Sequence, residues 1–134
     1  MFTLISGPAG DDKATRIVDR AKVVAAEERP LAVIDFKGAA QWSQLTGEQD
    51  IAFWSNPPPF MVAMIMESSF PGSTVFLDGI QFAGSSEGVY MPEESALLLL
   101  LAMCMRSREQ GFDLVATWAG TVPHTLMEAA DVIQ

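Results

Sequence analysis

The chain has 134 residues, enough for one domain that buries roughly two-thirds of the surface its unfolded chain exposes. Hydrophobic residues make up 49% and charged residues 19%, a balance that is typical of a well-filled globular core and excludes an intrinsically disordered chain. The net charge of −9 argues against direct binding of nucleic acid, because such binding depends on Lys and Arg side chains that neutralise phosphates.

The single cysteine and the apolar runs limit the cellular setting. Cys104 is the only cysteine, so an intramolecular disulfide and a two-cysteine metal site are both excluded. The first residues lack the basic start and apolar stretch of a secretion signal. The longest apolar run, residues 96–105, is about half as long as a membrane crossing needs. We therefore expect a cytoplasmic protein without membrane insertion.

The first half of the chain alternates strand and helix patterns. Residues 1–6 predict a strand that stops at Gly7, and residues 14–28 carry apolar side chains at helical spacing. Residues 30–36 form a nearly continuous apolar run, which is typical of a strand covered on both faces. Residues 37–56 have no clear period, and we expect only a short helix near 41–45 and a brief strand at 51–54.

The second half continues the alternation. Residues 60–68 predict a helix behind three prolines, and residues 73–79 predict a buried strand. Residues 92–110 predict a helix that opens with Glu93 and Glu94, which complement the helix dipole, and ends at Gly111. A strand at 113–119, a short helix at 123–130 and the start of a strand at 131–134 follow. The pattern predicts an α/β fold with a mainly parallel sheet and helices on both faces.

The segment GPAGDDKAT, between the first strand and the first helix, occupies the place of a phosphate-binding loop. In that loop, G-x-x-x-x-G-K-[ST], backbone N–H groups wrap the phosphates, the lysine reaches the outer ones, and the hydroxyl binds magnesium. Gly7 and Lys13 fit this frame, but Asp12 replaces the second glycine and Ala14 replaces the hydroxyl residue. The alternative interpretation is an ordinary turn lysine, although the place between a strand and a helix favours the loop.

Two further features of this segment weaken nucleotide binding. Thr15 does not supply the missing hydroxyl, because one position along a helix turns a side chain by about 100°. Asp11 and Asp12 each cost on the order of 1 kcal/mol beside a triphosphate, even in high dielectric. We therefore expect weak or absent nucleotide binding. The binding residues, if the site is retained, are Gly7, Gly10, Lys13, Thr15 and Asp78.

Asp78 ends the buried strand at 73–79 and is the candidate metal ligand. An aspartate at the carboxyl end of a strand beside a phosphate loop would hold Mg²⁺ through water. The next residue, where a carboxylate that activates water is usual, is Gly79. The alternative is that Asp78 caps a turn before a glycine.

The order of these segments resembles the core of the FtsK/HerA superfamily of DNA-pumping ATPases, which includes the Zot-like phage assembly proteins. The resemblance is carried by LISGPAGDDKAT, LAVIDFKG, VFLDGIQ and RSREQGFDLVATWAGTVPHTLMEAADVIQ, and it covers most of the chain. It implies one degenerate P-loop NTPase-like domain over residues 1–134, a three-layer fold with a five-stranded sheet in the order 5-1-4-3-2. Asp12, Ala14, Gly79 and Trp118 depart from the family at its working positions.

Other residues carry weaker signals. Arg106 and Arg108 end the long helix where the family can present an arginine to a neighbouring subunit's nucleotide, although cations are also favourable near any helix C-terminus. His124 is the only histidine and indicates a surface position at a helix start. The three tryptophans lie in or beside predicted loops and would mark a contact surface if they were exposed together.

The function that fits these observations is a non-catalytic P-loop ATPase-fold module that acts through a protein partner or a homo-oligomer. The Zot-like similarity suggests a phage or mobile-element DNA-handling assembly, and hence the host cytoplasm. The alternatives are a slow ATPase that uses Lys13 and Asp78 and borrows an arginine across a ring, and a nucleotide-binding switch without turnover. Only these alternatives need ATP and Mg²⁺ as cofactors.

Overall fold

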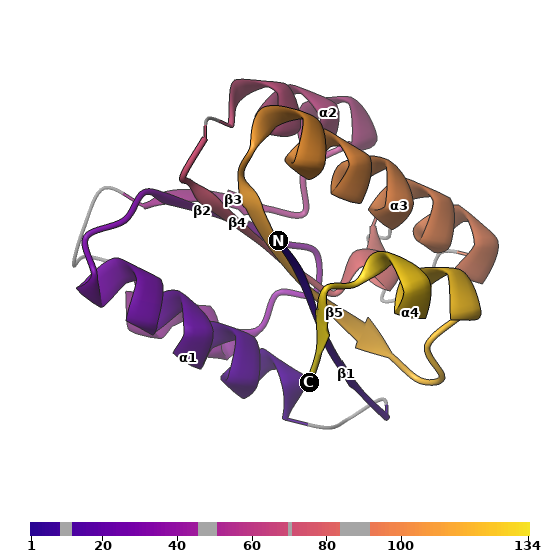
Figure 1. Cartoon of the computed structure of the whole chain (residues 1–134). Coiled ribbons are helices and arrows are strands. Elements are labelled where there is room, and N and C mark those ends of the chain that lie inside the picture. The colour runs from indigo at the N-terminus through magenta and orange to yellow at the C-terminus, as the bar shows by residue number, and fades with distance from the viewer. Residues whose placement is uncertain (9–11, 46–50, 70, 84–91) are drawn as a thin grey trace.

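A computed structural model describes residues 1–8, 12–45, 51–69, 71–83 and 92–134. The described residues form one six-stranded sheet with helices on both faces, as Figure 1 shows. The strands are β1 (Phe2–Gly7), β2 (Leu31–Asp35), β3 (Ala52–Ser55), β4 (Thr74–Asp78), β5 (Asp113–Ala119) and β6 (Val132–Ile133). The helices are α1 (Lys13–Ala26), α2 (Pro59–Ser68), α3 (Glu93–Gln110) and α4 (His124–Ala129), with 3₁₀ turns η1 (Ala40–Leu45) and η2 (Ile80–Phe82).

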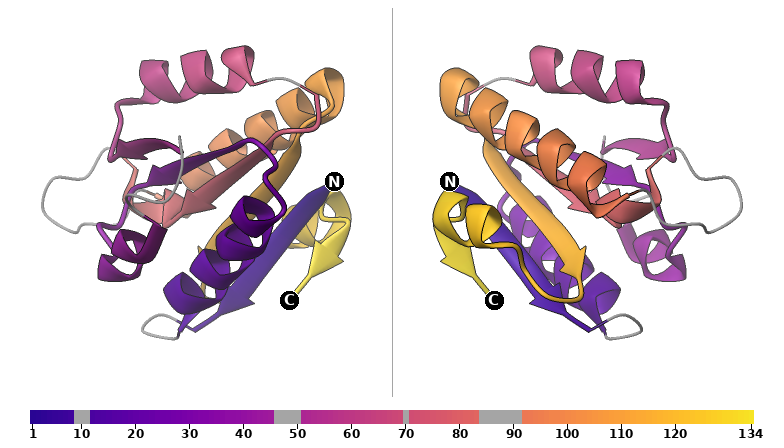
Figure 2. Two further views of the ribbon diagram at one scale, coloured as in Figure 1. Left: turned by 90° about the vertical axis from the view of Figure 1, so that its left-hand side faces the viewer. Right: turned by 90° about the vertical axis from the view of Figure 1, so that its right-hand side faces the viewer.

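The sheet order is β3-β2-β4-β5-β1-β6, and every neighbouring pair is parallel. The predicted order of the five strands is therefore confirmed. The predicted number of strands is wrong by one, because the brief strand expected at 51–54 pairs with β2 as β3 and extends the sheet at that edge. Both termini lie at the opposite side, beside β6 (Figure 2).

Two apolar cores lie on the two faces of the sheet. Helices α2, α3 and α4 cover one face, and α1 with η1 covers the other (Figures 1 and 2). The strands are buried on both faces, which explains their continuous apolar runs. Alternate strand residues serve the two cores: Leu77 packs under α3, and Phe76 packs under α1.

The helix boundaries follow the expected signals. Helix α1 buries one apolar stripe, and α3 begins directly after Pro92 and ends at Gly111, whose φ is +77°. The Gly111 N–H donates to the carbonyl of Ser107, so the glycine closes the last turn in a conformation that other residues rarely adopt. In the part of the chain that the structure describes, none of the helices has both the length and the apolar character that crossing a membrane requires.

Candidate functional site

The carboxyl ends of the parallel strands meet at one edge of the sheet, where ligand sites of open α/β folds lie. Gly7 ends β1, stands in register with Ala119 of β5, and accepts a hydrogen bond from the Gly120 N–H at 2.9 Å. The chain enters α1 at Lys13 after Asp12. The strand, loop and helix therefore follow one another as predicted. Gly10 and Asp11 lie outside the described residues.

Lys13 is folded back onto its own loop. Its side chain is 3% exposed, and its ammonium Nζ donates to the carbonyl of Pro8 at 2.5 Å. Ala14 is buried against the sheet, whereas Thr15 is exposed, so Thr15 lies on a different side of the helix from position 14. Asp12 is exposed and has a φ of −82°, a conformation open to any residue. Asp12 therefore differs from the loop glycine that it replaces by its charge and not by backbone strain.

Asp78 ends β4, and its buried carboxylate accepts a hydrogen bond at each oxygen. The side chain is 2% exposed. Its Oδ2 accepts a hydrogen bond from the indole Nε1 of Trp42 at 3.0 Å, and its Oδ1 accepts one from the hydroxyl Oγ1 of Thr117 at 3.0 Å. The same Thr117 oxygen accepts the N–H of Gly79 at 2.9 Å. Among the described residues, no group of three or more His, Cys, Asp or Glu side chains is arranged to hold a metal ion.

Trp42 is the residue that sequence reasoning missed. It lies in η1, is 2% exposed, and packs edge-on against Phe76 and Phe53 with ring centroids 6.5 and 6.3 Å apart. The tryptophans would mark a contact surface only if they were exposed together, and this condition is not met, because Trp42 and Trp118 are both buried. The sequence carries no signal that places Trp42 beside Asp78; once both side chains are buried, the indole N–H needs an acceptor and the carboxylate needs donors.

A second carboxylate stands directly beside Asp78. Asp35 ends β2, is the register partner of Asp78, and is 3% exposed. Burial raises the pKa of Asp35, and the negative charge of Asp78 raises it further. The N–H groups of Lys37 and Gly38 donate to its Oδ1 at 3.1 and 3.0 Å and oppose this rise in the pKa without cancelling it. Two buried carboxylate residues therefore lie side by side at the ends of adjacent strands.

Gly79 has a left-handed backbone conformation in which a residue with a side chain is strained. Its φ is +77°, and a Cβ atom at this position would lie 2.8 Å from the Cβ of Lys37. Real Cβ atoms do not approach another carbon this closely, so a larger residue requires the chain after β2 to move. The carboxylate that the FtsK/HerA resemblance would imply here is thus absent, and it would not fit without this shift.

Trp118 and Gln81 hold the end of β5. Trp118 belongs to the core under α3 and α4, and its indole Nε1 donates to the carbonyl of Thr121 at 3.2 Å. Because strand residues alternate between faces, Trp118 points away from the side on which Thr117 meets Asp78. The Gln81 amide donates to the Ala119 carbonyl at 2.9 Å and accepts the Ala119 N–H at 2.8 Å, which ties η2 to β5.

The candidate arginines lie at the other edge of the sheet. Helix α3 leads into the amino end of β5, so its last turn is remote from the strand ends that carry Asp78. Arg106 forms ion pairs with Glu67 at 3.4 Å and Glu109 at 3.6 Å, and Arg108 donates to the carbonyl of Ala129 at 2.5 Å. The structure brings neither arginine to Lys13 or Asp78 of the same chain.

His124 has the surface position that was expected. It is the first residue of α4, its side chain is 81% exposed, and its Nε2 lies 2.9 Å from the Glu128 carboxylate one turn later.

The comparisons with known proteins concern the fold. No family model matches the chain, and no curated protein matches its sequence. RuvB of Thermotoga maritima, a Holliday junction branch migration motor, superposes with a TM-score of 0.54 at 18% identity, over 98% of this chain. Two variants of RuvB superpose with a TM-score of 0.55 at the same identity. The chain spans 36% of the length of these structures and has the P-loop NTPase fold.

Proposed function

We propose that the chain is a non-catalytic domain of the P-loop NTPase fold that acts through protein partners. The observation that carries the proposal is the engagement of Asp78, whose two carboxylate oxygens accept hydrogen bonds from Trp42 and Thr117. Mg²⁺ usually keeps several of its waters, so a carboxylate that holds the ion through water must offer an oxygen to one of them. Because the Asp78 side chain is only 2% exposed, reaching such a water would require it to turn outward and lose these hydrogen bonds, of about 1.5–3 kcal/mol each.

The phosphate loop supports the same conclusion. Lys13 is buried and donates to its own loop at Pro8, so nucleotide binding would first require this contact to open. Ala14 offers no hydroxyl to the metal, and Gly79 leaves no room for a carboxylate that activates water. Single positioned groups contribute about 10²- to 10⁴-fold to a reaction rate, so their joint loss costs several orders of magnitude.

Steady-state hydrolysis tests this proposal. Purified protein with ATP and Mg²⁺ should release no phosphate above the buffer rate. Steady turnover that disappears in Lys13→Ala would overturn the proposal and favour the alternative, a slow ATPase or ATP-binding subunit. The observation that favours the alternative is the retained lysine at the entrance to α1.

Restoring the loop tests whether the nucleotide space survives. Asp12→Gly with Ala14→Ser removes one repelling charge and supplies the metal hydroxyl, so the double variant should gain ATP affinity in calorimetric titration. Asp11→Asn should add to the gain. Hydrolysis should stay negligible, because Gly79 and Trp118 remain. If the double variant is folded and binds ATP no better than the parent, the space in which a nucleotide would lie is filled by the protein itself.

The wider setting is part of the same proposal. The resemblance of the strand-end motifs suggests a member of the FtsK/HerA branch and a phage or mobile-element DNA-handling assembly in the host cytoplasm. In such an assembly the net charge of −9 favours contact with protein rather than with DNA. Co-purification with a motor subunit from the same genome would support this setting. Purification without any such subunit would count against it.

A further inference from the structure

A small pocket lies at the amino ends of the strands, on the face of the sheet that α1 covers. Its lining includes Arg20 and Val24 of α1, Arg29 in the turn after α1, and Thr74 and Asp113 at the starts of β4 and β5. The pocket, here called the Arg20 pocket, has a volume of about 70 Å³. A single water needs about 10–15 Å³ of such space, so the pocket has room for a small ion but not for a nucleotide.

Arg20 is the residue that distinguishes this pocket. Its side chain is half-buried, and its guanidinium forms no hydrogen bond or ion pair with the residues that the structure describes. Arginine is rarely covered by protein without a partner, because a charge removed from water costs free energy unless it is paired. The chain has 17 acidic and 8 basic side chains, so carboxylates are in excess. An unpaired guanidinium in such a protein points to a partner that the described fold does not supply.

The other charged side chains do not neutralise Arg20. The carboxylate in the lining, Asp113, accepts a hydrogen bond from the nitrogen of Met1 at 3.0 Å, and no ion pair among the described residues joins it to Arg20 or Arg29. Arg29 brings a second guanidinium, whose Nε lies 2.7 Å from a carboxylate oxygen of Glu27. The side chains of the lining therefore carry two positive charges and one negative charge, which favours an anion.

The hydroxyl of Thr74 is a second polar group without a partner in the described chain. Thr74 is 3% exposed, and its buried Oγ1 forms no hydrogen bond. It lies two residues before Phe76, which packs under α1, so its side chain is on the α1 face. Rotation about χ1 between staggered positions exchanges the hydroxyl with the methyl group. An acceptor in the pocket would then satisfy a hydroxyl whose burial otherwise costs free energy.

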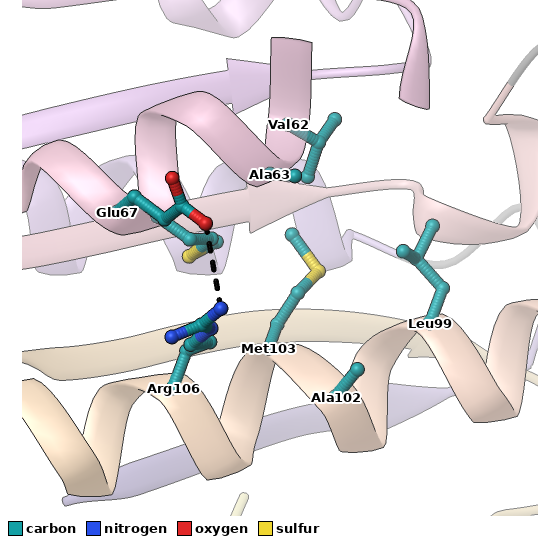
Figure 3. Close-up of a pocket in the computed structure, with 8 residues that line it drawn as sticks. Val62, Ala63, Glu67, Leu99, Ala102, Met103 and Arg106 are labelled. Atoms are coloured by element: carbon teal, nitrogen blue, oxygen red, sulfur yellow. Dashed lines mark hydrogen bonds and ion pairs between the residues drawn. The ribbon is translucent and has the colours of Figure 1, made fainter. Parts of the chain in front are cut away.

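The groove between α2 and α3, on the other face of the sheet, lacks such groups. It has a volume of about 160 Å³, and its two charged residues, Glu67 and Arg106, form an ion pair with each other at 3.4 Å, as Figure 3 shows. The other side chains that line it are apolar. The unpaired guanidinium and the unpaired hydroxyl therefore set the Arg20 pocket apart from this larger hollow.

We propose that the Arg20 pocket binds a phosphate group, held by the Arg20 guanidinium and the Thr74 hydroxyl. The fork of an arginine donates two parallel N–H bonds to a phosphate or a carboxylate. A carboxylate uses both of its oxygens on one such fork, whereas a phosphate keeps further oxygens for Thr74 and for the exposed Arg29. The phosphate is either the free ion or the end group of a phosphomonoester.

This site is separate from the phosphate loop. Helix α1 begins at Lys13, beside the carboxyl end of β1, and its last turns lie at the amino ends of the strands. Lys13 and Val24 are eleven positions apart in the helix, which corresponds to roughly 16 Å along its axis. The inference therefore goes beyond the proposed function and does not depend on it.

Nuclear magnetic resonance of isotope-labelled protein tests this inference residue by residue. Inorganic phosphate up to about 20 mM, compared with sodium chloride at equal ionic strength, should shift the amide signals of Arg29, Thr74 and Asp113 with a dissociation constant on the order of 1 mM, as expected for so small a ligand. Acetate should bind more weakly than phosphate. Phenyl phosphate separates the two sources: similar affinity identifies a phosphate end group, and much weaker binding identifies the free ion.

Three variants locate the site. Arg20→Gln should weaken phosphate binding at least about tenfold, because it removes charged donors. Thr74→Val should weaken binding about fivefold, and it should raise the melting temperature of the free protein by about 3 °C, because it removes a buried hydroxyl without a partner. Lys22→Gln is the matched control: it changes the net charge equally on α1, outside the pocket lining, and should bind phosphate like the parent.

Two kinds of result would overturn the inference. Phosphate-dependent shifts confined to the amides of Lys13 and Ala14 would place the ion in the loop. Unchanged phosphate affinity in Arg20→Gln or Thr74→Val, with circular dichroism showing a folded protein, would show that these side chains do not hold it. The proposed function would stand in either case, because it depends on the absence of ATP turnover.

Discussion

The hydrogen bond from Trp42 to Asp78 leads to a quantitative prediction. Trp42→Phe removes the indole N–H that donates at 3.0 Å to a carboxylate that is 2% exposed. Removing the donor leaves a charged acceptor buried and unsatisfied, which costs about 1.5–3 kcal/mol. The smaller ring adds a packing loss on the order of 1 kcal/mol. The free energy of unfolding should therefore fall by about 3 kcal/mol, out of a typical 5–15 kcal/mol.

Trp118→Phe is the matched control. Trp118 is also fully buried at the end of a central strand, but its indole donates to the neutral carbonyl of Thr121 at 3.2 Å. A neutral hydrogen bond contributes about 1 kcal/mol, so this variant should lose about 2 kcal/mol in total. Urea denaturation followed by circular dichroism measures both variants. Equal losses in the two variants would refute the claim that Trp42 stabilises a buried charge.

A double-mutant cycle isolates the pair. Asp78→Asn replaces one carboxylate oxygen, an acceptor, by an amide NH₂, a donor. This donor lies against a group that donates in the parent, either the Trp42 indole N–H or the Thr117 hydroxyl. The substitution should therefore cost less in the Trp42→Phe background than in the parent. The expected coupling energy is about 1 kcal/mol or more. Additive losses would show that the two side chains act independently.

Three other sites yield predictions of their own. Because the pKa of Asp35 is raised above its ordinary 3.8, this group's contribution to stability is full below pH 3.8 and declines as the pH rises through the folded-state value. Asp35→Asn should thus be at least as stable as the parent at about pH 7 and lose that advantage at about pH 3 in urea titrations; a pH-independent difference would contradict the raised pKa. Burial raises the pKa of the Cys104 thiol, which is 1% exposed. A thiol reagent should therefore react with Cys104 only as fast as the protein unfolds in urea, and rapid labelling of the native protein would contradict this burial. Gly79→Ala should cost about 2 kcal/mol or more in thermal unfolding, whereas the control Gly72→Ala, with a φ of +86° and no atom within 4 Å of its added Cβ, should cost about 1 kcal/mol; equal costs would mean that Lys37 yields easily.

The elements of the fold were predictable because their signals are local. The strands at 30–36, 73–79 and 113–119 are continuous apolar runs, and Gly111 ends α3 by its own backbone freedom. The order of five strands came from the resemblance and is confirmed. The place of β3 was not predictable, because its four residues carry a weak pattern and its pairing with β2 is decided by the packing of the segment between them.

The partners of Asp78 were harder to predict than its position. The strand pattern places Asp78 at a carboxyl end, which the structure confirms. Trp42 lies 36 residues before it and Thr117 lies 39 residues after it, so both contacts depend on the tertiary packing. The stretch around η1 has no regular period from which a buried tryptophan could be predicted. The alternation of β5, by contrast, already implies that Thr117 and Trp118 face opposite sides.

We propose that Asp78, which is engaged by Trp42 and Thr117, does not hold a magnesium nucleotide. Isothermal titration calorimetry of the purified protein with ATP and Mg²⁺ tests it most directly. We expect no saturable heat of binding for the parent, and none for Lys13→Ala. A one-site isotherm for the parent that is lost in Lys13→Ala would contradict the claim, because it would show that the loop and the strand end still bind a nucleotide.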